Sequence, residues 1–257
     1  MRRVSKSRKY VASKLSKTNA IVKDERLRIH VPETRPLSSS SLRELLHKYG
    51  MVYVKPVSGM HGNGVVRVEH LPDSSSRQPY CYHYKRELRT FRSYQEMSDS
   101  LLKLAGRRPY LVQRGIRLLK HNGRMFDIRV MVQRNPSGHW ETTGIIGRVA
   151  EVGKVVTNYH NGGAPTPLNA LLSPKIGEAR TAAIAQSLAS IGRRAAAALS
   201  RTYPGIDTIG VDVGLDQRYR PWIIEVNTSP DHYLFKHLKD RRSFRRILRY
   251  ARALGRI

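Results

Sequence analysis

The chain has 257 residues, and a hydrophobic content of 40% is enough to build the core of one large or two small domains. It carries 47 Lys and Arg against 19 Asp and Glu, a formal net charge of +28 at pH 7, so an acidic partner is expected. The single cysteine, Cys81, excludes an internal disulfide and a cysteine-built zinc site. Neither a transmembrane stretch nor an apolar run behind the basic start is visible, which predicts a cytoplasmic protein.

Basic residues concentrate at both ends of the chain. Residues 1–30 hold ten Lys or Arg against two acids, and residues 236–257 hold nine against Asp240. Charge of this kind favours association with a polyanion, and nucleic acid, an anionic membrane surface and an acidic polymer all satisfy it. A solvated basic surface without a dedicated partner is the alternative.

The N-terminal part of the chain predicts a basic arm and linker, because the prolines and serines of "HVPETRPLSSSS" favour extended chain. From Ser41, "SLRELLHKY" predicts a helix that opens with a capping-box pattern and carries leucines on one face. Residues 52–57 and 65–69 predict two strands joined by a glycine loop. A second capped helix follows, with Ser93 at its start and Gly106 after its end.

The rest of the chain predicts a β-rich block and two further helices. The stretches "YLVQRGIRLL", "MFDIRVMVQR" and "HWETTGIIGRVA" indicate an antiparallel meander. After a Gly/Pro/Asn loop at residues 157–169, Ser173 and Pro174 open a long helix. The stretches "DTIGVDVGL" and "RPWIIEVNTS" predict a hairpin, and a helix with apolar and basic residues at helical spacing follows Tyr233. Mixed elements with mostly antiparallel pairs predict an α+β fold.

The strands of this last hairpin carry carboxylates. Strict alternation leaves Asp212 opposite an apolar face made by Ile209, Val211, Val213 and Leu215. On the second strand it puts Trp222, Ile224 and Val226 on one face, and Ile223, Glu225 and Asn227 on the other. Two carboxylates and an amide are therefore expected to converge, and such oxygen ligands suit Mg²⁺. Ordinary solvated carboxylates are the alternative.

The meander offers a second group of charged residues. In "MFDIRVMVQR", Asp127 and Arg129 share the polar face, and Arg148 of the next strand is expected to point the same way. Two guanidinium groups near a carboxylate form a phosphate clamp, because their planar geometry matches phosphate oxygens. A cross-strand salt bridge on a solvated face is the alternative.

The glycine loop lies within "VYVKPVSGMHGNGVVRV", residues 52–68. Its Lys55 precedes the loop, and a strand rather than a helix follows Gly64, so neither a Walker-type loop nor a Rossmann fingerprint fits. Two interpretations remain open: a loop that bends over phosphates between antiparallel strands, or a hairpin turn that needs glycine.

Together these stretches resemble an ATP-grasp enzyme, and in detail the YheC/YheD-like ATP-grasp family associated with the bacterial endospore coat. The matching stretches include "HVPET", "KYGMVYVKPVSGMHGNGVVRV", "GRMFDIRVMVQRN", "GRVAEVGKVVTNYHNGGAPTPL" and "GIDTIGVDVGLD…PWIIEVNTSP", and they cover most of residues 30–235. The resemblance implies an ATP-grasp fold, in which two α+β subdomains with mostly antiparallel sheets hold ATP and Mg²⁺ between them. The implied division is a basic arm and linker (1–40), a small subdomain (41–109), a large subdomain (110–235) and a basic C-terminal helix (236–257).

The resemblance also implies a role for each candidate residue. Lys55 reaches the ATP phosphates, and the flexible loop over them contains Gly59, Gly62 and Gly64. Gln113 borders the adenine, at a position where many ATP-grasp enzymes carry glutamate. Arg129 and Arg148 are the catalytic phosphate and acyl-phosphate ligands, with Asp127 orienting them and Asn158 as a further polar contact. The implied Mg²⁺ ligands are Asp212, Glu225 and Asn227.

The chemistry implied is attack of a substrate carboxylate on the ATP γ-phosphate, followed by capture of the acyl phosphate by an amine. Positioning and charge neutralisation carry such a reaction, so it needs cations and a metal more than a strong base. The implied partners are ATP and an unidentified carboxylate substrate, such as an acidic peptide or polymer, together with the spore coat. The alternatives are an ATP-grasp phosphotransferase and a non-catalytic basic protein that binds the coat or another polyanion.

Overall fold

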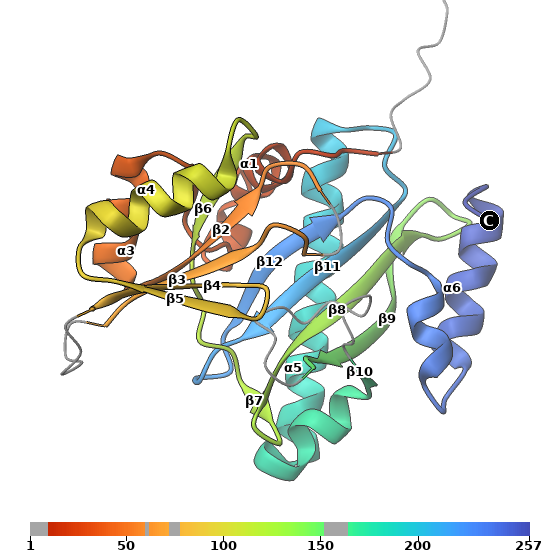
Figure 1. Ribbon diagram of the computed structural model, residues 1–257. Coiled ribbons are helices and arrows are strands. Elements are labelled where there is room, and N and C mark those ends of the chain that lie inside the picture. Colours follow the sequence, from red (N-terminus) through yellow and green to blue (C-terminus); the bar gives the residue numbers. More distant parts are fainter. Residues whose placement is uncertain (1–9, 60–61, 72–77, 152–163) are drawn as a thin grey trace, which may run out of the picture.

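The computed structural model describes residues 10–59, 62–71, 78–151 and 164–257. In these ranges the strands pair antiparallel and form two sheets, and helices cover both (Figure 1). This architecture confirms the α+β fold with mostly antiparallel sheets. Of the helices described, none is both long and apolar enough to cross a membrane.

The first sheet has the strand order β1-β6-β2-β3-β4-β5. Its strands are β1 (Thr34–Pro36), β6 (Tyr110–Arg114), β2 (Met51–Pro56), β3 (Val66–His70), β4 (Tyr80–Tyr84) and β5 (Glu87–Phe91). One face is apolar and packs against the helices α3 (Ser39–Tyr49) and α4 (Tyr94–Ala105). On the opposite face Tyr53, Arg67 and His83 form a row across neighbouring strands, because directly paired residues of an antiparallel sheet point the same way.

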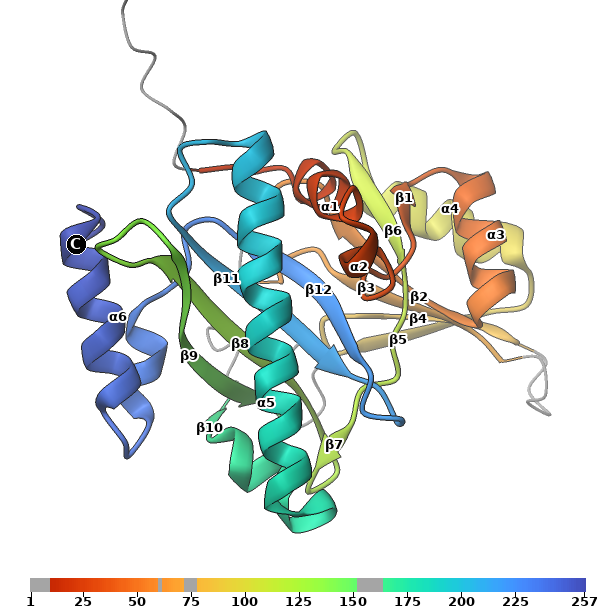
Figure 2. The same ribbon diagram turned by 180° about the vertical axis from the view of Figure 1, so that it is seen from behind.

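The second sheet has the order β10-β9-β8-β11-β12, and the short β7 pairs with β8. The strands are β10 (Ala164–Thr166), β9 (Trp140–Val149), β8 (Arg124–Arg134), β11 (Thr208–Leu215), β12 (Pro221–Asn227) and β7 (Lys120–His121). The long helix α5 (Leu168–Thr202) crosses one face, as the view from behind shows (Figure 2). Gly192 allows this close approach, since a Cβ there would lie 2.8 Å from Val130 Cγ1.

The C-terminal segment covers part of the opposite face of the second sheet. A 3₁₀ turn, η2 (Tyr233–His237), and the helix α6 (Arg242–Ala253) bury Phe235 and Ile247 against Met131. The apolar stripe predicted for this segment is therefore confirmed. The predicted continuous helix is interrupted, because Leu238 after η2 has an extended backbone, and Asp240 accepts a hydrogen bond from the Arg242 backbone N–H where α6 starts.

Within the described residues, the predicted N-terminal arm is folded from residue 14 on and is not free chain. Residues Lys14–Val22 form the helix α1 and Glu25–Arg28 form the short helix α2. Ile21 and Leu27 are 2% and 0% exposed and belong to the core beneath the second sheet. The many basic residues of this segment had favoured an exposed arm, although its apolar residues have the spacing of a buried helix face. The four-part division of the chain stays a prediction, although β6, which it assigns to the large subdomain, pairs within the first sheet.

Three helix starts test the capping predictions. Helix α3 begins earlier than predicted, because Ser38, and not Ser41, is its N-cap and exchanges hydrogen bonds with Ser41. Ser93 caps α4 as predicted, by accepting a hydrogen bond from the Glu96 backbone N–H. Helix α5 begins at Leu168, ahead of the predicted start, and the left-handed Gly177 (φ 75°) breaks it.

Candidate functional site

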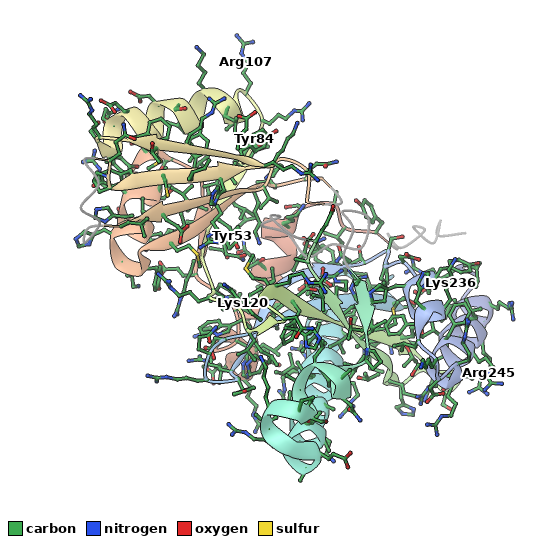
Figure 3. All side chains as sticks on the ribbon, turned by 60° about the horizontal axis from the view of Figure 1, so that its bottom comes forward. Tyr53, Tyr84, Arg107, Lys120, Lys236 and Arg245 are labelled. Carbon is green, nitrogen blue, oxygen red and sulfur yellow. The ribbon has the colours of Figure 1, made fainter. Side chains whose placement is uncertain are left out.

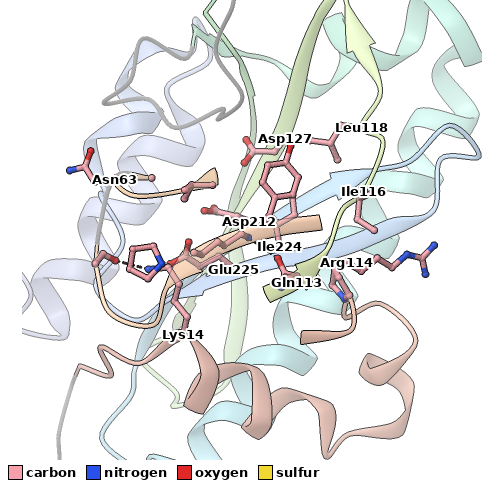
Figure 4. Close-up of a pocket in the computed structure, with 17 residues that line it drawn as sticks. Lys14, Asn63, Gln113, Arg114, Ile116, Leu118, Asp127, Asp212, Ile224 and Glu225 are labelled. Carbon is pink, nitrogen blue, oxygen red and sulfur yellow. Dashed lines mark hydrogen bonds and ion pairs between the residues drawn. The ribbon is translucent and has the colours of Figure 1, made fainter. Parts of the chain in front are cut away.

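Seven of the predicted site residues line one pocket between the two sheets, which we call the central pocket (Figure 4). These residues come from β2, the glycine loop, β6, β8, β11 and β12, and they are Lys55, Gly59, Gly62, Gln113, Asp127, Asp212 and Glu225. Gly64 lines a neighbouring pocket, and Asn158 lies outside the described residues. The structure therefore brings residues that are up to 170 positions apart into one site.

Lys55 is a buried cation beside a neutral partner. Its Nζ donates a hydrogen bond of 2.7 Å to Gln113 Oε1, and the residue is 6% exposed. Gln113 Nε2 in turn donates to Thr34 Oγ1, so both ends of this amide are bound by the protein. Burial lowers the pKa of Lys55 to about 8, although the Glu225 carboxylate partly opposes the shift. An anionic ligand would therefore find a cation that lacks a close carboxylate.

A buried ionic network lies below the pocket and joins β8, β9 and β11. Arg148 Nε donates to Asp127 Oδ1 at 2.8 Å, and Arg148 Nη2 lies 3.1 Å from Asp212 Oδ2. Arg129 Nε donates to Asp212 Oδ1 at 2.5 Å. Asn227 Nδ2 also donates to Asp212, at 3.2 Å. The expected shared face of these residues is confirmed, and the network is a paired, buried one rather than a solvated salt bridge.

The charges within this network stabilise one another. Burial raises the pKa of Asp212, but the guanidinium groups of Arg129 and Arg148 overcome that effect and hold it below its usual range. Burial likewise lowers the pKa of Arg148, and the carboxylates of Asp127 and Asp212 more than reverse this. Asp212 and Arg148 therefore stay ionised, and the hydrogen bonds of the network fix the orientation of the guanidinium planes.

A β-bulge on β12 turns Ile224 toward the central pocket beside Glu225. Asp212 pairs with Glu225, but the next residue, Val213, pairs with Ile223, so Ile224 is an extra residue on β12. Ile224 and Glu225 both line the pocket, whereas Ile223 joins Val226 in the core. The prediction that Ile223 shares a face with Glu225 is wrong, because strict alternation holds only in a regular strand. The apolar face of β11 is confirmed.

Two lysines of α1 belong to the site and were not predicted. Lys14 Nζ donates to the Gly59 carbonyl at 2.7 Å and lies 3.7 Å from Glu225 Oε1. Lys17 is 5% exposed in a small cavity that Lys55 and Glu225 also line, and burial lowers its pKa. The available signal was the K-x-x-K spacing behind Ser13, which caps α1. It was hidden among the many basic residues of a segment expected to be an arm.

The glycine loop is the hairpin connection between β2 and β3, as the strand-loop-strand order predicts. Gly62 and Gly64 have φ angles of 73° and 78°, in the left-handed region that favours glycine. A Cβ on Gly64 would lie 2.8 Å from Pro56 Cγ and 2.9 Å from the Tyr110 hydroxyl. The backbone conformation therefore requires glycine at this turn whether or not the loop contacts a ligand.

The donor set for a metal is small. The described residues contain no group of three or more His, Cys, Asp or Glu that could hold a metal ion. Glu225 is the more available carboxylate, with its side chain 25% exposed, whereas hydrogen bonds from Arg129 and Asn227 already engage Asp212. Such a set fits Mg²⁺, which takes few protein ligands and relies on water and substrate phosphates.

Solved structures with the same arrangement define the class of this fold. The chain aligns with VanG D-Ala:D-Ser ligase from Enterococcus faecalis with a TM-score of 0.59 and 13% identity, over 95% of this chain and 61% of that one. It aligns with the D-cycloserine synthetase DcsG at 0.56 and 14% identity, over 95% and 70%. An N5-carboxyaminoimidazole synthase from Aspergillus clavatus, solved with ADP, gives 0.55 and 14%, over 94% and 51%. The fold is thus the ATP-grasp fold of these ligases.

The sequence places the chain more narrowly. The family profile described as "YheC/D like ATP-grasp" matches residues 6–254, so the chain belongs to the YheC/D-like ATP-grasp family. The endospore coat-associated protein YheD of Bacillus subtilis (strain 168) is 27% identical over 242 residues, 86% of this chain and 51% of YheD. The protein YheC of the same organism is 23% identical over 202 residues, 78% of this chain and 55% of YheC. The chain spans about half the length of these relatives.

Proposed function

We propose that the protein is a Mg²⁺-dependent ATP-grasp ligase that joins a carboxylate to an amine through an acyl phosphate. The observation that carries this proposal is the convergence of Lys55, Asp212 and Glu225 on one pocket between the two sheets. Lys55, whose close partner is neutral, can neutralise the phosphates of a bound nucleotide. Asp212 and Glu225, on paired strands, can hold the metal that accompanies it.

The phosphate end of ATP lies beside Lys55 and Lys14 in this proposal. The glycine loop closes over the phosphates, and its backbone can approach them because Gly62 and Gly64 have no side chains. The cavity enclosed in the present state is about 90 Å³, smaller than the 300 Å³ or more of typical ligand sites. In this proposal the bound nucleotide widens the pocket, and the 2.7 Å hydrogen bond from Lys14 to Gly59 breaks or shifts.

Glu225, Asp212 and Asn227 would hold the metal. When bound, Mg²⁺ would neutralise charge on the phosphate oxygens. Glu225 is presented by β12 directly opposite Asp212, and Asp212 is held by Arg129 and Arg148. In this arrangement the arginines position a metal carboxylate before any ligand arrives, which reduces the reorganisation needed on binding.

The two arginines would also stabilise charge on the transferred group. A carboxylate oxygen of the substrate attacks the γ-phosphorus, the bond to the β–γ bridging oxygen breaks, and ADP leaves. An amine nitrogen then attacks the acyl carbon, releases phosphate and loses a proton. Arg148 and Arg129 present planar donors fixed by Asp127 and Asp212, so they can hold an anionic intermediate without first being ordered.

Incubation of the protein with Mg·ATP, pooled amino acids and acidic peptides tests this proposal. We expect ADP, phosphate and a product whose mass equals the sum of the carboxylate and amine substrates less one water, measured by mass spectrometry. Added hydroxylamine should trap the acyl phosphate as a hydroxamate. ADP with a phosphorylated hydroxyl product and no hydroxamate would instead identify a phosphotransferase. Nucleotide binding without turnover in any mixture would contradict an enzymatic role.

We also propose that the protein acts at the spore coat. This rests on YheD and YheC being described as endospore coat-associated proteins, together with the net charge of +28, which suits an acidic surface. A fluorescent fusion expressed from its own locus during sporulation should mark the forespore periphery. Uniform fluorescence throughout sporulation would contradict this proposal.

A further inference from the structure

A second and larger cavity continues from the central pocket between the two halves of the molecule. It shares Tyr53, Ile116 and Leu118 with the central pocket and has a volume of about 750 Å³. The proposed function assigns it no ligand. We call it the basic groove, and its walls come from β3, β4, the residues between β6 and β8, and the end of β9.

The walls of the basic groove are strongly cationic. Seven Lys or Arg line it, and Glu151 is the one acid among its described residues. Arg86 lies 3.7 Å from Glu151, across the groove, and 75% of its side chain is exposed. Within the described part of the chain no ion pair joins Lys85, Lys120 or Arg124 to an acid. The described acids therefore leave these three cations unneutralised, and an anionic ligand in the groove could pair with them.

Two residues that line the groove carry buried polar atoms without hydrogen-bond partners. Among the described residues, four buried side-chain nitrogen or oxygen atoms have no hydrogen-bond partner. Two of them, Arg67 Nε and His83 Nδ1, belong to the row across β3 and β4 that lines the groove. Buried polar groups are normally paired, and the exceptions call for an explanation such as a missing ligand. Arg67 is partly neutralised by Glu69, at 2.7 Å, but its Nε–H remains a free donor.

The tip of the β4–β5 hairpin supplies the outer cations. Lys85 and Arg86 form its turn, and Lys85 has a φ angle of 57°, a conformation in which lysine is uncommon. Strands β2 and β4 both run antiparallel to β3, so they run in the same direction as each other. Lys55 comes two residues after Tyr53 on β2, and Lys85 comes two residues after His83 at the end of β4, so both lysines lie toward the same edge of the sheet. The hairpin tip therefore places positive charge at the same end of the sheet as Lys55, the lysine proposed to bind phosphate.

The side chains that line the groove favour a ligand with carboxylates over one with nucleobases. Sites for single-stranded nucleic acid combine cations with exposed aromatic rings on which bases stack. The described groove residues include one aromatic ring besides His83, that of Tyr53, which lies between Lys55 and Arg67 on the sheet. Arginine and lysine without a stacking platform match carboxylate groups instead.

We propose that the basic groove binds an acidic peptide segment, several of whose carboxylates pair with Lys85, Lys120 and Arg124 while one enters the central pocket. The proposal deepens the ligase function and rests on it for the fate of that one carboxylate. Binding of the segment itself rests on the groove alone. The acceptor or donor would then be a glutamate- or aspartate-rich chain rather than a free amino acid.

Fluorescence anisotropy with labelled octaglutamate tests the proposal, with Mg·ATP affinity measured separately on the same samples. The groove variant Lys120→Glu with Arg124→Glu should bind octaglutamate at least tenfold more weakly and keep its affinity for Mg·ATP. The matched control is Lys236→Glu with Arg245→Glu, which changes the net charge equally. Figure 3 shows that Lys236 and Arg245 lie on the C-terminal segment, far from Lys120 and Tyr53. This control should change octaglutamate affinity less than twofold.

Three results would overturn the proposal. The two double variants could lose affinity equally, which would assign binding to net charge. Labelled oligothymidylate of eight nucleotides could bind more tightly than octaglutamate and depend on Lys120 and Arg124, which would assign the groove to nucleic acid. Octaglutamate could also fail to bind at 50 mM salt. If the unmodified protein does not bind Mg·ATP, the ligase function is contradicted, but the octaglutamate measurements still test the groove.

Discussion

At the scale of single residues, Lys55 is the cation whose surroundings best match an anionic ligand, because its close partner is the neutral Gln113. Lys55→Ala should weaken ATP binding by about 1.5–3 kcal/mol, the usual worth of a hydrogen bond to a charged group. Titration calorimetry measures the change. Lys103→Ala, on the exposed face of α4, is the control and should leave affinity unchanged. Equal affinities for the two variants would remove Lys55 from the proposed phosphate site.

The pKa of Lys55 also predicts proton uptake. In the free protein burial lowers this pKa to about 8, so above pH 8 the neutral form of the Lys55 side chain predominates. Phosphate binds the charged form and raises the pKa again, so ATP binding between pH 8 and 9 should take up protons and weaken as pH rises. Calorimetry in buffers of different ionisation enthalpy measures the uptake. Lys55→Arg should abolish it, whereas uptake that persists would belong to another group, such as Lys17.

The two carboxylates should respond differently to neutralisation. Glu225→Gln should reduce Mg·ATP affinity at least tenfold without loss of stability, because the side chain is partly exposed and has one long ion pair. Asp212→Asn should reduce affinity and also destabilise the fold by about 3–5 kcal/mol, because Arg129 and Arg148 lose a buried partner. Equilibrium dialysis and urea denaturation separate the effects. Glu178→Gln, exposed on α5, is the control; unchanged affinity in both site variants would disprove the metal assignment.

At the scale of elements, α1 and α2 belong to the core, so substitutions there should change the free energy of unfolding, as substitutions in a free arm would not. Leu27→Ala should lower the free energy of unfolding by about 2–5 kcal/mol, because Leu27 is 0% exposed. Ile29→Ala, two residues later, should change it by less than about 0.5 kcal/mol, because Ile29 is 58% exposed. Urea denaturation measures both. Similar small effects would mean that this segment detaches in solution.

The elements also show how far the sequence could predict the site. Alternation along β8 correctly grouped Asp127 with Arg129, because that strand is regular across the residues concerned. It failed on β12, because the bulge at Ile224 depends on the pairing of two strands and leaves no mark in the residues themselves. The α1 lysines were missed for another reason. Charge density suggested solvent exposure, while burial depended on contact with a sheet more than a hundred residues away.

At the scale of the whole molecule, the central pocket draws on both sheets, so its ligand should stabilise both together. Mg·ATP at a hundredfold excess over its dissociation constant should add about 2.7 kcal/mol to the stability of the folded chain. Differential scanning calorimetry should show the whole unfolding transition moving upward. The Glu225→Gln variant should shift less at the same nucleotide concentration. Two separate transitions, of which one moves, would show that the nucleotide contacts a single half.

The bulge on β12 has a consequence for comparing this protein with others. Ile224 is the extra residue, so a homologous strand that lacks it would still pair its glutamate with the equivalent of Asp212 and point it into the pocket. A gap of one residue at this position in an alignment therefore does not signal loss of the acid. Comparison of such chains should align the carboxylates with each other, even where the strands differ in length.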